Sequence, residues 1–344
     1  MKTTGARDPM TFEQDVLNLA LKSLRERQGS GLLAPVPRRP RPRQRTAIAI
    51  AAAGIAIAIA LPIVLPGGGT GGAEPAAAAL LHRVALRAAQ QPREPAPGPG
   101  QFLYTKSESF STSLYVVGDG TTFLFQQPST RESWIGPDGS GRLLSTSGAV
   151  TFPTAGDRAT WVAAGSPDLY EHLTEDELFE PGALFSPDYA DLPTDPEELL
   201  ELIERREIPG IGGPDNDWGT FVIIGDLLRE TSLQPKVRAA LYQIVAEIPG
   251  VELVGRVIDG AGRPGVAVAY TNRNTDAPGR WELIFDPTTA ALLGENEVLV
   301  ADSTVDVESG GPGAIYGGVG PAGTRSYSGT YLVSGVVDST TDTL

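Results

Sequence analysis

The 344-residue chain contains no cysteine and only two histidines, His82 and His172. Without thiols it cannot form disulfides, use a thiol nucleophile, bind zinc through cysteine or carry lipid on a terminal cysteine. No G-x-S-x-G serine turn accompanies the histidines, although a Ser/His/Asp triad can assemble from distant positions. The sequence therefore predicts no catalytic, cofactor-binding or metal-binding residue, and it gives hydrolysis no positive support.

Charge is absent from one long stretch, the twenty residues 46–65. A helix of about 20 residues rises about 30 Å, the thickness of a bilayer's hydrocarbon core. The preceding residues 38–45 include five arginines, and basic residues mark the cytoplasmic side of a span. We expect one transmembrane helix with the N-terminus in the cytoplasm. A cleaved signal peptide is the alternative, because Gly71 and Ala73 are small, but the apolar run exceeds the usual 7 to 15 residues.

The net charge of −15 combines two opposite parts. Residues 1–45 hold ten Lys/Arg and four Asp/Glu, about +6, which leaves about −21 for the rest. A positive inner tail suits anionic lipid head groups, whereas a negative outer part repels nucleic acid. We therefore expect the lipid bilayer as a partner, and no nucleic acid.

The sequence predicts one short amphipathic helix in the cytoplasmic tail, 1–45. Thr11 and Gln14 have the spacing of a capping box, and the apolar residues Phe12, Val16, Ala20 and Leu24 recur at helical spacing. An apolar stripe needs cover, either from the membrane surface or from a partner protein. Residues 11–27 are thus the predicted contact for a cytoplasmic partner.

The chain beyond the span predicts an α+β order. Residues 66–100 read as a linker with an alanine-rich helix, 101–300 as the extracytoplasmic α+β domain, and 301–344 as a Gly/Ser/Thr-rich segment with a strand near 327–333 and a frayed end. Strands are expected at 101–109, 113–117, 121–126, 131–135 and 142–145, helices at 154–164, 172–179, 196–203, 218–228 and 235–248, and strands at 251–258, 266–270, 280–285 and 292–300. The helices at 218–228 and 235–248 should pack on an antiparallel sheet and bury Leu241.

Three local patterns have simple structural explanations. The match to G-x-G-x-x-G at 318–323 lacks the helix that a dinucleotide site requires. The sequence Asp215-Asn216-Asp217 resembles the start of a calcium loop but lacks the later glutamate, so a turn and helix cap are expected. The acidic run at 168–180 is typical of a solvated helix face. None of the three predicts a cofactor.

Several short sequence motifs, in order along the chain, resemble those of a known family. They are TRESW at 130–134, LPTDP at 192–196, GDLLRE at 225–230, GRPGVAV at 262–268 and LIFDP at 283–287. Together they resemble uncharacterised actinobacterial single-pass membrane proteins, over most of the chain up to about residue 300. Members often accompany extracytoplasmic-function sigma factors, so the resemblance implies a role in envelope sensing. It implies no site residue.

The sequence thus favours a non-enzymatic, membrane-anchored sensor or accessory protein of the cell envelope, with a sigma factor or its regulator as the expected cytoplasmic partner. Zinc-type anti-sigma domains use histidine and cysteine, and the tail has neither. The alternative is a cell-surface module that binds an apolar ligand or envelope component, which a deep cavity between sheet and helices would favour. An exported hydrolase is a third alternative, which a buried carboxylate pair or a Ser–His hydrogen bond would favour.

Overall fold

The computed structural model describes residues 72–169, 171–184, 191–205, 216–230, 233–273, 278–304 and 312–344. The chain divides into two compact units after Gly69, and all of these residues belong to the second unit, Thr70–Leu344. The predicted helix within 11–27 and the predicted transmembrane helix at 46–65 lie outside the described residues. Among the helices described, none is long and apolar enough to span a bilayer.

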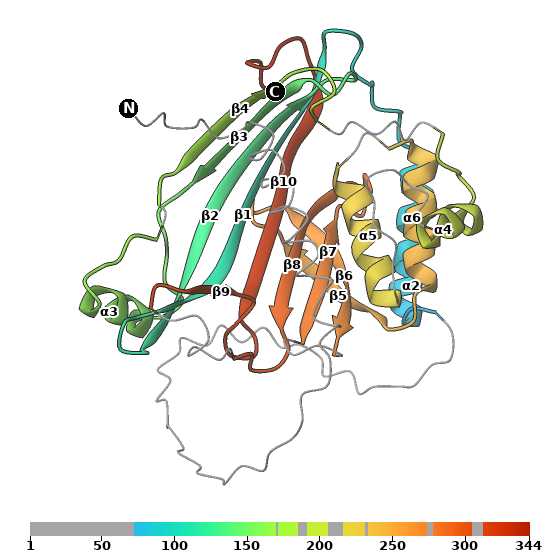
Figure 1. Ribbon diagram of the computed structural model, residues 1–344. Helices are drawn as coiled ribbons and strands as arrows, with labels where there is room; N and C mark the ends of the chain where they lie inside the picture. Colours follow the sequence, from blue (N-terminus) through green and yellow to red (C-terminus); the bar gives the residue numbers. More distant parts are fainter. Residues whose placement is uncertain are drawn as a thin grey trace. The chain divides into compact units, whose positions relative to one another are not determined.

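The second unit is built from one large antiparallel sheet and helices, which confirms the α+β class. In chain order its elements are α2 (Pro75–Ala89), β1 (Phe102–Val116), β2 (Thr122–Ile135), β3 (Gly141–Ser147), α3 (Ala155–Ala163), β4 (Thr174–Phe179), α4 (Pro196–Glu204), α5 (Asp217–Glu230), α6 (Pro235–Glu247), β5 (Val251–Ile258), β6 (Pro264–Asn272), β7 (Gly279–Phe285), β8 (Leu292–Leu299), β9 (Ile315–Gly317) and β10 (Arg325–Val337). The strand order is β4-β3-β2-β1-β10-β8-β7-β6-β5, with β9 beside β1 (Figure 1).

Strand β10 joins the two halves of the sheet. Strands β1 to β4 form one meander and β5 to β8 another, and β10 pairs with β1 on one side and β8 on the other. The strand expected near 327–333 is confirmed as part of β10, which is longer than expected, and the residues after it are held by Trp134 and Arg142 where a frayed end was expected. Small residues let β10 approach its neighbour closely, since a Cβ added at Gly294 would lie 2.4 Å from the carbonyl oxygen of Gly329. The same small residues made the sequence look like a tail.

Strands β1 and β2 form one long hairpin where four short strands were expected. They have 15 and 14 residues, and their pairing is continuous from Leu103–Ile135 to Val116–Thr122. Pro128 lies within β2, opposite Phe110 of β1. Its carbonyl accepts from Gly148 N beyond the end of β3, so its missing N–H also faces that side and removes no bond to β1.

The region 172–179 was predicted to be helical but contains β4, a six-residue edge strand. Its residues pair with β3, and the carboxylate of Asp176 accepts from Arg142 Nε and Nη2, at 2.7 Å each. Pairing with a neighbour that is distant in sequence overrides the local helical pattern. Its charged side chains suit an edge, where they discourage pairing with other chains.

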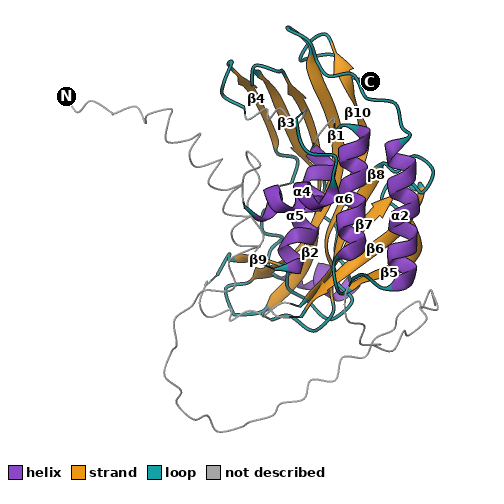
Figure 2. Cartoon of the chain, turned by 90° about the vertical axis from the view of Figure 1, so that its right-hand side faces the viewer, coloured by secondary structure: helices purple, strands orange, loops and turns teal. Residues whose placement is uncertain are grey.

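The five described helices lie on the same side of the sheet, and α4 is attached to it through α6. Side chains alternate between faces along a strand, and the paired residues Val268 and Leu283 belong to the face that meets α2, α4, α5 and α6. Helix α3 meets the same face at its other end, over Phe123 and Phe125. Figure 2 shows α2 and α6 side by side over β5 to β8. Each end of the helix-facing surface therefore has its own apolar cluster.

The largest core lies between the helices and β5 to β8. Its fully buried members include Leu81, Leu199, Phe221, Leu227, Leu241, Tyr242 and Phe285. The predicted burial of Leu241 is confirmed. Helix α2, assigned above to a linker, instead packs into this core, and Glu74 at its start accepts from Leu253 N and donates its own N–H to Val251 O.

Candidate functional site

Three carboxylates are buried among the described residues, namely Asp259, Glu282 and Glu295. Burial of a charge is unfavourable unless the charge is paired and hydrogen-bonded. Each of the three forms an ion pair with an arginine, in three different places on the sheet. These clusters are the strongest candidates for chemistry in the second unit.

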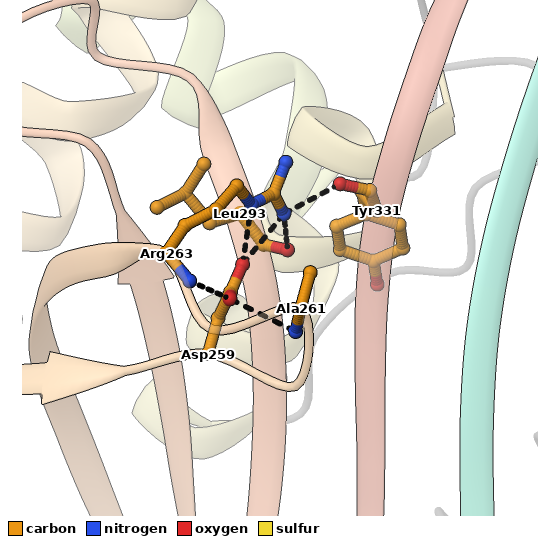
Figure 3. Close-up of polar contacts among 5 residues, drawn as sticks. All are labelled: Asp259, Ala261, Arg263, Leu293 and Tyr331. Atoms are coloured by element: carbon orange, nitrogen blue, oxygen red, sulfur yellow. Dashed lines mark hydrogen bonds and ion pairs between the residues drawn. The ribbon is translucent and has the colours of Figure 1, made fainter.

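The first cluster closes the β5–β6 hairpin (Figure 3). Asp259 Oδ1 accepts from Ala261 N at 3.0 Å and from Arg263 N at 2.8 Å, and Oδ2 accepts from Arg263 Nε at 2.7 Å. The Nη2 of Arg263 donates to the carbonyl oxygens of Leu293, at 3.1 Å, and Tyr331, at 2.7 Å. One guanidinium thus ties the hairpin to β8 and β10.

Both carbonyl oxygens lie beside β-bulges. The pairing of β8 with β7 shifts next to Leu293, and the pairing of β10 with β1 shifts just after Tyr331. A bulge interrupts the regular ladder and leaves main-chain groups in need of another partner. Arg263 supplies that partner, so the role of this cluster is structural.

The second cluster crosses three strands on the face away from the helices. Glu282 on β7 accepts from Arg280 Nη2 at 2.6 Å and from Asn296 Nδ2 of β8 at 3.0 Å. Ser328 Oγ of β10 donates to Asn296 Oδ1 at 2.9 Å. Both oxygens of the carboxylate are therefore held by fixed donors.

The third cluster lies on the helix-facing side, where α5 meets the sheet. Glu295, of which 1% is exposed, accepts from Trp281 Nε1 at 3.1 Å and from the Tyr331 hydroxyl at 2.6 Å. Arg229 Nε of α5 lies 3.7 Å from the same carboxylate, and Arg229 also pairs with Asp226 one turn earlier. Burial and the nearby Glu295 charge raise the pKa of Tyr331 well above its usual value.

The two buried glutamates do not form the carboxylate pair that glycoside chemistry uses. Glu282 pairs with Asn296, whereas Glu295 pairs with Leu283, so the two acids project from neighbouring strands to opposite faces. Such acids cannot flank one scissile bond. The observation that would have favoured a glycosidase is therefore missing from the described residues.

The histidines lie apart from these clusters. His82 lies on the surface of α2, with its Nε2 3.9 Å from the Glu247 carboxylate of α6. His172 is exposed in a turn and has a φ of 57°. Within the described ranges neither histidine hydrogen-bonds a serine, and no group of three acidic or histidine side chains is arranged to hold a metal ion.

Two of the three local sequence patterns lie in a helix cap and a turn, whereas the acidic run at 168–180 includes strand β4 and not a helix. Asn216 caps α5, because its Oδ1 accepts from Gly219 N at 2.9 Å. The match to G-x-G-x-x-G lies in the connection from β9 to β10 and is followed by a strand. Sequence reasoning missed the arginines. The one local signal was an acid and an arginine four residues apart around a glycine turn, Asp259 and Arg263.

The fold and clusters define an α+β domain with a ten-stranded antiparallel sheet and paired buried acids. Comparison of the chain with family models, with curated proteins and with solved structures finds no match. The resemblance to the actinobacterial membrane family therefore stays a prediction.

Proposed function

We propose that this chain is a membrane-anchored sensor or accessory protein of the cell envelope, whose outer domain acts by binding and not by catalysis. The proposal that the outer domain binds and does not catalyse rests on one observation. Every buried carboxylate described forms an ion pair with an arginine. General acid–base catalysis needs a group that exchanges its proton beside a substrate. These acids instead hold a hairpin, three strands and a helix in place.

The anchored topology rests on the uncharged run 46–65 and the arginines before it. In this arrangement the second unit is extracytoplasmic and residues 11–27 face a cytoplasmic partner. A sigma factor or its regulator is the proposed partner, on the strength of the family resemblance.

The charged attachment of α5 supports a sensing role. Arg229 and Glu295 join this helix to β8, and Tyr331 extends the network to β10, the strand shared by both meanders. Buried ion pairs contribute little net stability compared with apolar packing. The charged groups that attach α5 to the sheet have discrete partners. A ligand that exchanges one of these partners could therefore shift the position of α5.

Packing between helices and sheet does not favour the alternative of an enclosed apolar ligand. Aromatic rings fill this layer, with centroid distances of 5.6 Å between Tyr242 and Phe285 and 6.0 Å between Phe221 and Tyr270. The Tyr242 hydroxyl donates to Ala290 O across the same layer at 2.8 Å.

Co-purification from membranes tests the proposal. The full chain should retain a cytoplasmic protein that a chain lacking residues 1–30 loses. Replacing Phe12 and Val16 by serine should abolish the same interaction at unchanged length, whereas Asn18→Ala, off the apolar stripe, should preserve it. Absence of any protein lost on truncation would remove the signalling role, and turnover of a substrate by the outer domain would contradict the binding role.

A further inference from the structure

A separate aromatic cluster lies on the sheet face opposite the helices, near the ends of β1 and β2. The rings of Tyr104 and Trp134, which are paired across the two strands, have centroids 5.1 Å apart. Phe102, Leu144, Val333 and Val337 pack around them. We call this set the aromatic surface. It belongs to neither of the clusters beneath the helices.

The aromatic surface is covered by residues 338–344, which turn back after β10 and are here called the strap. Trp134 Nε1 donates to the carbonyl oxygen of Asp342 at 2.6 Å, and Arg142 Nη1 donates to that of Thr340 at 3.1 Å. The side chain of Leu344 lies beside Gly335, at 2.5 Å from the position of an added Cβ. Under this cover Trp134 is only 2% exposed.

Trp134 and Arg142 donate to main-chain carbonyl oxygens of the strap and not to its side chains. Residues 341–344 are exposed, and Leu344 itself is 62% exposed. Among the described residues, the side chains of the strap make one hydrogen bond to the rest of the domain, at its root, where Gln101 Nε2 donates to Asp338 Oδ1 at 2.9 Å. An extended segment with other small polar side chains would satisfy the same two donors.

The donors are held in place independently of the strap. Arg142 is fixed by its two bonds to Asp176, and its guanidinium carbon lies 5.1 Å from the centre of the Trp134 ring. The Tyr104 hydroxyl donates to Glu132, which also pairs with Lys106 at 3.2 Å. A surface ordered before binding loses less entropy when a ligand arrives.

We propose that the aromatic surface is a binding site for an extended peptide segment of another protein, rich in small polar residues, and that the strap occupies it as an internal competitor. A tethered segment competes at an effective concentration on the order of millimolar. The partner therefore binds when the strap is unseated. This inference does not rest on the proposed membrane topology or on sensing.

Peptide binding to two forms of the full chain tests the proposal. The probe is a labelled synthetic peptide with the sequence of residues 338–344, titrated against the intact chain and against a chain lacking 339–344. We expect the shortened chain to bind the peptide at least about tenfold more tightly than the intact chain. In the shortened chain, Trp134→Phe should weaken binding because the ring remains but the donor is lost, while Trp161→Phe should leave it unchanged.

A reversible lock provides the second measurement in the intact chain. Because the chain has no cysteine, Gly335→Cys with Leu344→Cys introduces one pair, and the Leu344 Cγ lies 3.8 Å from the position of an added Cβ at Gly335. The oxidised variant should bind no peptide, and reduction should restore the level of the intact chain.

Three binding results would overturn the proposal. They are equal peptide binding by the intact and shortened chains, no binding by a folded shortened chain, and equal binding by the oxidised and reduced forms of the locked variant. Unfolding of the shortened chain would show that the strap is a structural part of the sheet, and would overturn the proposal equally.

Discussion

Replacing Arg263 by alanine removes one guanidinium that serves the Asp259 carboxylate and the carbonyl oxygens of Leu293 and Tyr331. Hydrogen bonds to charged groups contribute about 1.5–3 kcal/mol each. The Arg263 side chain is 35% exposed, so water replaces part of the loss. Asp259 keeps its two main-chain donors, which limits the penalty further. We expect the free energy of unfolding to fall by about 2–4 kcal/mol.

Two further variants separate charge from geometry. Arg263→Lys keeps the charge, but a single ammonium cannot reproduce the planar fork, so about 1–2 kcal/mol should be lost. Asp259→Asn keeps the Oδ1 acceptor that closes the turn and loses the ion pair. Urea unfolding of the second unit, followed by tryptophan fluorescence and circular dichroism, measures the free energy of unfolding for all three variants.

The reasoning predicts strong coupling between Asp259 and Arg263. In a double-mutant cycle, the two substitutions together should destabilise the domain by clearly less than the sum of their separate effects. Additive effects, or an Arg263→Ala change within about 0.5 kcal/mol of the unsubstituted chain, would show that the cluster does not hold the hairpin to β8 and β10.

Leu241→Ala should lower the free energy of unfolding by about 2–5 kcal/mol, because the side chain is fully buried. Leu178→Ala, at a 76% exposed position, should change it by less than about 0.5 kcal/mol, and equal effects of the two substitutions would contradict the packing. Burial and Glu132 raise the pKa of Tyr104 from 10.0 to about 12, so its contribution to stability is present below pH 10 and lost as the pH rises to 12. The unfolding free energy of Tyr104→Phe should then fall less steeply over that range; parallel curves would refute the assignment. A reporter active only in the cytoplasm should work when fused before Arg38 and fail after Pro66, and activity at both positions would refute the anchor.

The helices and the second meander could be predicted because their signals are local. Asp195 and Pro196 begin α4 as expected, with Asp195 Oδ1 accepting from the main-chain N–H of Glu197 and Glu198. The apolar spacing in α5 and α6 identified helices that do cover a sheet. Alternation between Gly/Pro turns likewise located β5 to β8 within a few residues.

Long-range pairing was not available to the same reasoning. Strand β4 has a helix-like acidic pattern and becomes a strand because β3 pairs with it. The sequence of β10 by itself has a weak strand pattern. Its place between β1 and β8 follows because the edge strand of each meander has main-chain groups that need a partner. The strap lies on Trp134 through a hydrogen bond to Asp342, which is 208 residues away in the sequence.

The sequence by itself determined the α+β class, the uncharged run at 46–65, the caps of α4 and α5 and the positions of β5 to β8, because propensity, capping and periodicity act over a few residues. Only the tertiary structure decided that the two meanders form one sheet, that each buried acid has its arginine, and that residues 338–344 cover an aromatic surface. Those features depend on the closure of long loops and on groups brought together by folding, whose spacing along the chain carries no local pattern.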